Sequence, residues 1–385
     1  MLHRWTFWLV ILLGFGVLTL VVWLGMALPA SSPTTNDDTV DNETVSTAND
    51  EDAPAEPIIY VTIVSHNEDT RSPAYPDYSL DQAALDTQRD DVAQFAATVT
   101  AHGAAYDFQT DWNFLLGLQT FDDASDSTDG KNLLAYLHDL GVSIDPHSHE
   151  GLSYNYADVA YLISTFGVEP SGIVGGFLAS PVSSSKLEYL WEPIVGSTYP
   201  SYTWTPTAAW GGGTANHQDE MLLWTSGIWR PQDEAHIDVH DPDAPLPVIG
   251  HYNSDWTGLD RLLELQAAGE LEAGNMYTVT IMTNQYQLTD EYVEAFAEKI
   301  DAYTDDVDAG RMTWMTLPNI LTTWQTQYNE SPSHLVWDGD DTKSELSPGS
   351  DSGTSSDTPR TGGCGDGVCA LFERTRGTCT EDCGS

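Results

Sequence analysis

Apolar and polar residues recur with two different periods in the middle of this chain, and together they predict alternating strands and helices. Residues 58–64 form a continuous apolar, β-branched run, which is typical of a buried strand. Residues 81–102 then carry apolar side chains at helical spacing, with a glycine at the expected end. A short strand at 104–109, a helix at 131–140 and a strand that ends at Asp145 come next.

The same alternation continues to about residue 329. We expect further strands at 171–177, 224–229, 247–252, 277–282 and 311–316, and helices at 259–273, at 290–303 and from 318 onward. Strands separated by single helices are typical of parallel βαβ units, and about seven such units favour a barrel over an open sheet. The pattern therefore predicts an α/β fold, a deformed (β/α) barrel of about seven parallel strands.

The two ends of the chain differ from this central domain at 58–329. Residues 5–30 are uncharged and almost entirely apolar, long enough for roughly 30 Å of hydrocarbon. We predict that residues 1–30 are a transmembrane anchor, with the basic residues before the helix inside and the remainder outside the cell. Cleavage after Ala30 is the alternative, and it would give a secreted protein. Residues 31–57 and 330–363 are polar and acidic and are predicted to be flexible linkers.

All four cysteines lie in the last segment, residues 364–385. Two disulfides are expected in an exported segment of this size, and a structural zinc site is the alternative. The opening Cys364-Gly365-Asp366-Gly367-Val368-Cys369 resembles small cysteine-rich modules of exported microbial proteins. That resemblance implies a cross-linked, calcium-binding appendage without a catalytic role.

The charge of the chain restricts its partners. It has 13 Lys and Arg against 59 Asp and Glu, for a formal net charge of -46. Such a balance excludes nucleic acid and anionic membrane surfaces as partners. Depletion of lysine with an excess of aspartate fits a habitat of high salt, where counterions screen the repulsion between carboxylates. An ordinary acidic exported protein is the alternative.

Two short polar stretches follow predicted strands and carry the candidate chemistry. His66 and Glu68 come after the first strand, and His147 and His149 come after the strand that ends at Asp145. In extended chain, residues i and i+2 point the same way, and parallel strands end at the same edge of a sheet. Three imidazoles and one carboxylate in one place predict a divalent metal site, with zinc as the favoured metal.

A metal-bound water that ionises near neutral pH would suit hydrolysis of an amide or ester. Asp111, Asp145 and Glu150 are the carboxylates placed to act as catalytic acid or base. Asp111 closes the neighbouring strand, so we favour it as the base; capping of the following turn is its alternative role. Trp112 and Trp229 lie beside predicted strand ends and could stack on sugar rings, while a place in the core is the alternative.

These motifs carry a family resemblance. The strand Ala104-Ala105-Tyr106-Asp107-Phe108-Gln109, the helix with L-L-x-x-L-x-x-x-G and the following H-x-H resemble the polysaccharide deacetylase family. In that family a metal-binding histidine comes six residues after the glycine, as His147 does after Gly141. Arg311-Met312-Thr313-Trp314-Met315-Thr316-Leu317 is similar to the family's closing strand.

The chain departs from the family at two motifs. The family has an Asp-Asp pair at the end of its first strand, where this chain has His66-Asn67-Glu68. Ser65-His66-Asn67-Glu68 is instead similar to the S-H-N-D of family 38 α-mannosidases, which belong to the same barrel superfamily and bind zinc through the His and the acidic residue. The second His of the family's H-x-x-x-H is replaced by Gly151. The resemblance therefore indicates the glycoside hydrolase/deacetylase barrel superfamily.

The resemblance implies roles for two further residues. Arg230, followed by a proline, resembles the family's arginine motif, which orients the catalytic carboxylate; a surface ion pair is the alternative. His251 could be the proton donor that the family places late in the chain; a structural histidine is the alternative. The sequence thus predicts a metal-dependent hydrolase of extracellular or cell-wall carbohydrate, acting by deacetylation. A glycosidase of the same superfamily and a non-catalytic surface glycan-binding protein are the alternatives.

Overall fold

A computed structural model of the chain describes residues 56–67, 76–122, 125–148, 153–176, 187–211, 225–233 and 236–336. The predicted membrane anchor and the cysteine-rich segment lie outside these residues, as do Glu68, His149 and Glu150. None of the helices in the described ranges combines the length and the apolar character that a membrane crossing needs.

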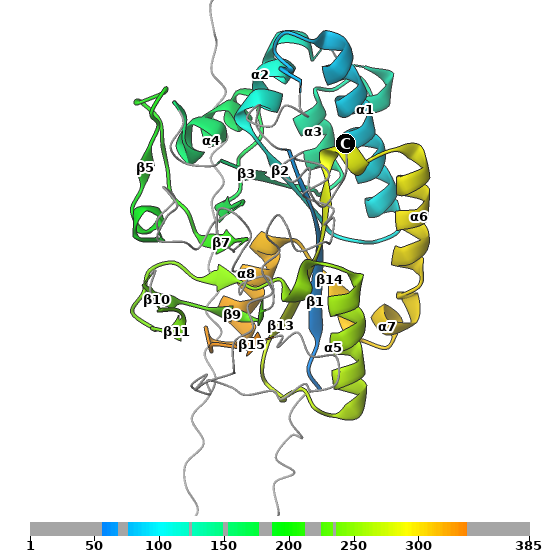
Figure 1. The fold of residues 1–385 in the computed structure, drawn as a ribbon, viewed down its shortest axis with the longest axis vertical. Helices are drawn as coiled ribbons and strands as arrows, with labels where there is room; N and C mark the ends of the chain where they lie inside the picture. Colours follow the sequence, from blue (N-terminus) through cyan, green and yellow to red (C-terminus); the bar gives the residue numbers. More distant parts are fainter. Residues whose placement is uncertain are drawn as a thin grey trace, which may run out of the picture. The chain divides into compact units, whose positions relative to one another are not determined.

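The centre of the fold is a parallel sheet with strand order β13–β1–β2–β3 (Figure 1). Its strands are β1 (Ile59–His66), β2 (Tyr106–Thr110), β3 (Ser143–Pro146) and β13 (Tyr277–Asn284), and β14 (Met312–Trp314) pairs with the start of β1. All of β1 is buried because both faces of the central strand are covered. The strands predicted for these five segments are therefore confirmed, with small differences at their ends.

Helices cover both faces of this sheet. The outer face of β1 carries Ile59, Val61 and Ile63, and these side chains belong to the largest hydrophobic cluster together with α1 and α6. The inner face carries Tyr60, Thr62, Val64 and His66; there Tyr60 and Val64 share a second cluster with α8. Figure 1 shows α1 and α6 on one side of β1 and α8 on the other. The helices are α1 (Gln82–Ala101), α2 (Trp112–Phe121), α3 (Leu133–Asp139), α4 (Tyr156–Thr165), α5 (Trp256–Ala268), α6 (Asp290–Asp301), α7 (Thr304–Asp308) and α8 (Leu317–Gln327).

A second sheet, with strand order β4–β7–β12–β9, continues from β3. Its strands are β4 (Ile173–Val174), β7 (Ala208–Trp210), β12 (Val248–Ile249) and β9 (Ile228–Trp229), and only β9 is antiparallel to its neighbour. A parallel bridge between His147 and Gly175 joins β3 to β4. On the other side, the second sheet contacts β13 through side chains, since Thr278 Oγ1 donates to the Gly250 carbonyl at 2.7 Å.

The described strands do not form a closed barrel, because no backbone ladder joins β12 to β13 within the part of the chain that the structure describes. The architecture is a mixed α/β fold with a parallel sheet and several helices. The α/β class is thus confirmed, while the predicted deformed barrel of about seven parallel strands is not closed in the described residues.

Short strands and 3-10 helices make up the remaining elements. The strand pairs are β5 (Ile194–Val195) with β6 (Thr203–Trp204), β10 (Pro231–Asp233) with β11 (His236–His240), and β8 (Thr225–Ser226) with β15 (Leu335–Val336). The 3-10 helices are η1 (Asp126–Thr128), η2 (Leu187–Trp191), η4 (Tyr252–Ser254) and η5 (Gln285–Gln287). The pairing of β15 with β8 keeps the chain in the fold through Val336, past the predicted boundary at residue 329.

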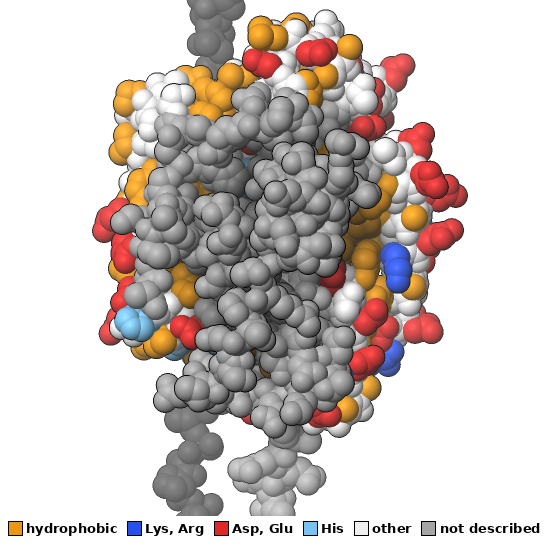
Figure 2. Space-filling model, viewed as in Figure 1, with side chains coloured by type: hydrophobic (Ala, Val, Ile, Leu, Met, Phe, Trp, Pro, Cys, Tyr) orange, Lys and Arg blue, Asp and Glu red, His pale blue; other side chains and the backbone are white. Residues whose placement is uncertain are grey.

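Acidic side chains gather over α6 and α7 (Figure 2). Asp290, Glu291, Glu294 and Glu298 are all exposed along α6, where Lys299 is the lone basic residue of the helix. Glu294 and Glu298 are four residues apart on one helix face, a spacing at which like charges repel. Screening of this repulsion is therefore expected to stabilise the fold.

We expect the free energy of unfolding in urea to rise as KCl increases from about 0.1 M to about 1 M, since the Debye length falls from about 10 Å to about 3 Å. A Glu294→Gln, Glu298→Gln double variant should be more stable at low salt, by about 0.3 kcal/mol, and should gain less from salt. Sucrose at matched osmolality is the control for the stabilisation that any solute gives when it is excluded from the protein surface. Equal salt slopes for the variant and the wild type would contradict this origin.

Candidate functional site

Three predicted site residues follow three adjacent strands of the parallel sheet. β1 ends at His66, Asp111 comes directly after β2, and His147 comes directly after β3. The strand ends are held level by two hydrogen bonds: Asn67 N–H donates to the Gln109 carbonyl and His147 N–H donates to the Thr110 carbonyl, both at 2.9 Å. Because β2 lies between β1 and β3, the inward side chains of all three strands meet at one edge of the sheet.

The structure brings His66 and His147 together. Their ring centroids are 4.6 Å apart and their planes are inclined by 44°. His66 is 8% exposed and His147 is 1% exposed, so both imidazoles lie below the surface. Within the described ranges, no group of three His, Cys, Asp or Glu side chains could hold a metal. The other two predicted ligands, Glu68 and His149, lie outside those ranges, so the four-residue site stays a prediction.

A glycine makes room for the His147 ring. Gly176, just after β4, has φ +70°, and a Cβ atom built on it would lie 2.2 Å from Cε1 of His147. Only glycine therefore fits, both for the left-handed backbone and for the space that the ring takes. A Cβ atom added to neighbouring Gly175 would lie 2.8 Å from Cδ of Gln109. The sequence contains a Gly-Gly pair here, but nothing in the local pattern indicates that it faces a histidine 29 residues earlier.

His251 belongs to the same cluster through Trp210. The Trp210 ring lies 5.3 Å from His66 and 5.1 Å from His251, and its Nε1 donates to Thr280 Oγ1 at 3.0 Å. Burial lowers the pKa of His251 to about 3, against a backbone hydrogen bond with Gly211 that raises it. The ring is therefore neutral at physiological pH, with one of its two nitrogens protonated, and its role as proton donor stays a prediction.

Asp145 lies on the inner face of β3, two residues before His147. Its Oδ1 accepts from Ser143 at 2.8 Å and from Ser171 at 2.5 Å, and its Oδ2 accepts from Gln109 at 3.4 Å. Burial raises the pKa of Asp145 to about 6, although these hydrogen bonds lower it. Asp145 thus supports the strand ends below the histidines.

A second buried carboxylate, Asp107, lies further down the inner face. It accepts from Thr62 Oγ1 at 2.7 Å and from the Leu317 N–H at the start of α8 at 3.1 Å. Burial, followed by the charge of Asp145, raises the pKa of Asp107 well above its usual range. Two buried carboxylates on one face of the sheet favour a state in which at least one is protonated.

Asp111 has the position predicted for it and also caps a helix. It is 1% exposed, and its Oδ1 accepts from the Phe114 N–H at 2.9 Å at the start of α2. The structure thus shows the capping role, and the role of Asp111 as base stays a prediction. Trp112 is half-buried and stacks on Tyr154 with centroids 4.9 Å apart.

Two predicted site residues lie elsewhere. Arg230 donates to the Ala244 and Pro245 carbonyls and forms an ion pair with Glu330 at 2.7 Å. β9 is antiparallel to β12, so Arg230, which follows β9, lies at the end of the sheet opposite to His251. Trp229 is fully buried, and its Nε1 donates to the Ile237 carbonyl at 2.7 Å. Arg230 thus acts as a structural ion pair, and Trp229 belongs to the core.

One support of the site was not indicated by the sequence. Asn67 is fully buried, and its Nδ2 donates to Oε1 of Gln285 at 2.5 Å. Gln285 in turn donates to the Tyr78 hydroxyl at 3.1 Å. These contacts fix the residue after His66 from the outer side of the sheet, and they join segments 218 positions apart.

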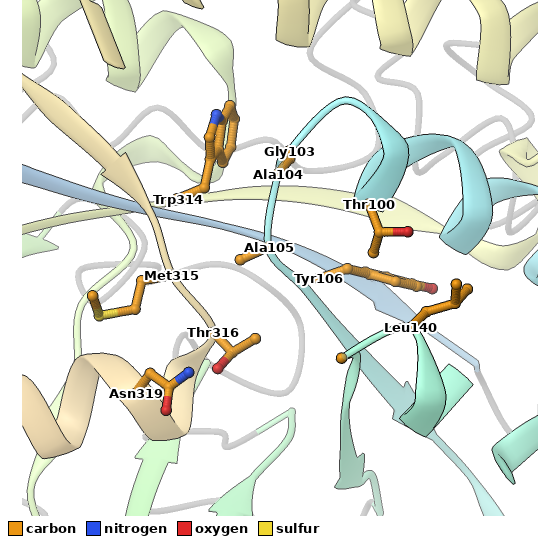
Figure 3. Close-up of a pocket in the computed structure, with 11 residues that line it drawn as sticks. Thr100, Gly103, Ala104, Ala105, Tyr106, Leu140, Trp314, Met315, Thr316 and Asn319 are labelled. Carbon is orange, nitrogen blue, oxygen red and sulfur yellow. The ribbon is translucent and has the colours of Figure 1, made fainter. Parts of the chain in front are cut away.

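A cavity of about 330 Å³ lies away from the histidines, at the amino-terminal end of β2. Figure 3 shows Trp314, Met315, Thr316 and Asn319 on one side of it and Ala105 and Tyr106 on the other. Its lining has no His, Cys, Asp or Glu. It therefore has no groups for metal binding or acid–base chemistry.

Comparisons with known proteins give little support for an assignment. No protein family model matches the sequence, and a search of curated proteins found no match. A solved structure described as a "putative glycoside hydrolase/deacetylase" from Parabacteroides distasonis is similar, with 10% identity and a TM-score of 0.38 over 71% of this chain and 72% of the other. A similarity at this level carries no argument about function, which rests on the residues themselves.

We expect Gly176→Ala to weaken zinc binding by about 10- to 100-fold, because the added methyl group displaces the His147 ring from its position. Gly274→Ala is the matched control: Gly274 also has positive φ, at +84°, but no atom lies within 4 Å of its added Cβ. Both variants should lose about 1–2 kcal/mol of stability from the left-handed backbone. Competition with a chromophoric zinc chelator measures the affinity. Equal zinc affinity in both variants would show that Gly176 does not position His147.

We expect Asp107→Asn to change the pH dependence of stability. The folded-state pKa of Asp107 lies above its unfolded value, so the folded protein holds this proton more tightly, and the contribution of Asp107 to stability falls as pH rises from about 4 through the raised folded-state pKa. The amide cannot ionise, so the variant should lose less stability over this range. Urea unfolding at several pH values measures this, with Asp308→Asn on the exposed surface as control. Parallel curves of unfolding free energy against pH for Asp107→Asn and the wild type would contradict the claim that the buried Asp107 carboxyl is protonated.

Proposed function

We propose that this domain is a metal-dependent hydrolase that removes acyl groups from extracellular or cell-wall carbohydrate. The observation that carries the proposal is the packing of the His66 and His147 rings, 4.6 Å apart, at the carboxyl ends of parallel strands. Buried imidazoles that face each other at this edge of an α/β sheet suit a shared ligand better than a structural core.

The proposed metal ligands are His66, Glu68, His147 and His149, and the favoured metal is zinc. Imidazole nitrogens with one carboxylate oxygen form a donor set that zinc accepts. The two described residues fit this role, because both rings are buried and adjacent, and Gly176 leaves the space that the His147 ring takes. When bound, the metal would supply a water that ionises near neutral pH.

The chain's own residues would then position the substrate and move protons. Asp111 lies at the end of the strand between the two histidines, so it is the proposed base; its Oδ1 is used by the helix cap, and Oδ2 is the oxygen that would accept the proton. Glu150 is the candidate for the catalytic acid. Asp145, held by Ser143 and Ser171, positions the strand ends below the site.

The fold is consistent with an open form of the superfamily barrel. β1, β2, β3, β4, β7, β12 and β13 follow one another around the two sheets, through the bridge at His147 and the contact from Thr278 to Gly250. The strand ends of this series carry His66, His147, Trp210 and His251 on one side. This arrangement supports the superfamily resemblance that the motifs indicate.

We further propose that the domain works outside the cell, on a membrane anchor formed by residues 1–30. The support is the uncharged apolar segment and the acidic linker after it. Recovery of the protein from the culture medium with Ser31 as its first residue would show instead that the segment is a cleaved signal.

The proposed function predicts zinc-dependent release of acetate. We expect the purified full-length chain to release acetate from acetylated xylan or glycol chitin without forming new reducing ends, and to lose this activity on chelation. His147→Ala should lose both zinc and activity, whereas His138→Ala, which removes an exposed histidine, should keep both. New reducing ends without acetate would indicate the glycosidase alternative. Binding of these polysaccharides with neither product would indicate the non-catalytic alternative.

Asp111→Asn separates the two roles of this residue in the same assay. Asparagine is as good a helix cap as aspartate, so the variant should fold with wild-type stability and bind zinc. Loss of the base should lower kcat by about 100- to 10,000-fold. Unchanged kcat would restrict Asp111 to capping.

A further inference from the structure

Five aromatic side chains form a continuous row beside the candidate site: Tyr154, Trp112, Tyr199, Tyr161 and Tyr202. Successive ring centroids are 4.9, 6.0, 4.2 and 5.5 Å apart. Trp112 and Tyr154 are stacked, with planes inclined by 5°. All except Tyr154 are partly exposed. One side of the row therefore packs against the hydrophobic core, and the other side is open to solvent. We refer to it as the aromatic row.

Trp112 links the aromatic row to the candidate site along the chain. It is the residue after Asp111, and Thr110, the residue before Asp111, accepts the His147 N–H. From Trp112 the row passes to Tyr199 in the turn between β5 and β6, then to Tyr161 on α4 and to Tyr202 in the same turn. Figure 1 shows α2, α4 and β5 on the same side of the molecule. The row therefore includes the residue that follows the proposed base.

The β5–β6 hairpin is firmly fixed to α4. Asp158 of α4 is fully buried, and its carboxylate accepts from the backbone N–H groups of Ser197, Thr198 and Tyr199 at 2.8 to 3.1 Å. Asn155 donates to the Val195 carbonyl at 2.9 Å. These bonds hold the tyrosines in place before any ligand binds, which lowers the entropy cost of binding.

The charges around the row restrict the ligand. Residues 153–176 and 187–211, which supply all of the row except Trp112, contain no Lys or Arg. On the face drawn in Figure 2, no Lys or Arg is seen over α4 and β5. An anionic polymer would find no cationic partner there, whereas aromatic faces favour the C–H groups of neutral sugar rings.

We propose that the aromatic row is a binding subsite for a neutral polysaccharide chain, with its Tyr154–Trp112 end toward the candidate site. The proposal deepens the proposed function, because it assigns a polymer rather than a single sugar as the substrate. It rests on that function only for the removal of acyl groups at the histidines. Binding along the row needs no metal and no reaction. It can therefore be tested separately.

The test is affinity electrophoresis of the full-length chain in gels that contain glycol chitin or acetylated xylan, with EDTA present throughout. Tyr199→Leu and Tyr202→Leu keep apolar contact with the core but remove an aromatic face. Each should weaken binding by about 3- to 10-fold, the size of one aromatic contact. Tyr136→Leu, which changes a partly exposed tyrosine on α3, is the matched control and should bind as wild type. Urea unfolding of each variant confirms that it is folded. Tyr161→Leu, which also removes one ring of the row, replaces a variant that is not. Tyr202→Phe keeps its ring and should bind as wild type.

Three outcomes would overturn the proposal: no retardation of the wild type by either polymer, equal retardation of the wild type and both row variants, or stronger binding to heparin than to the neutral polymers. Retardation that depends on Tyr199 and Tyr202 would support it, even if no acetate is released in the activity assay. Release of acetate without such retardation would uphold the hydrolase and remove the subsite.

Discussion

The register of three parallel strands determines the candidate site. The hydrogen bonds from Asn67 to Gln109 and from His147 to Thr110 keep the ends of β1, β2 and β3 level. A shift of one residue in either pairing would turn a histidine to the outer face, where the hydrophobic cluster of α1 and α6 lies. The contact between the two imidazoles thus depends on backbone pairing first and on side-chain packing second. Gly176 leaves room for the His147 ring, and the Asn67–Gln285 hydrogen bond holds the residue after His66.

Much of the central sheet could be predicted from the sequence. β1, β2, β3 and β13 carry strong local patterns, as do α1, α3 and α6, and the structure confirms them. The sequence pattern does not predict three of the described helices, α2, α4 and α7. In α2, Gly117 breaks the usual helical composition; the structure explains this glycine by Tyr78, whose Cβ would lie 2.7 Å from an added Cβ. The pattern predicts a deformed barrel, but local patterns contain no information about whether a last ladder closes.

The candidate site likewise has features that the sequence predicts and features that it does not. Spacing along each strand correctly brought His66 and His147 to one edge, since i and i+2 alternation and parallel pairing are local rules. Arg230 was taken from a two-residue motif, and the motif does not report that β9 is antiparallel to β12 and leaves the arginine at the opposite end. His251 lies beside Trp210, and burial lowers its pKa to about 3, while its role as proton donor stays a prediction. Such burial depends on Trp210 and other residues distant in the sequence.

The central claim is that the paired histidines bind a metal, and anomalous diffraction at the zinc edge from crystals grown with zinc tests it most directly. The account predicts a peak with imidazole nitrogens of both His66 and His147 about 2.0–2.1 Å away. The positions of Glu68 and His149 around that peak would then complete or correct the ligand set. Zinc bound only elsewhere in the crystal would contradict this claim. So would the absence of bound zinc at saturating zinc, with the two rings in contact only with each other.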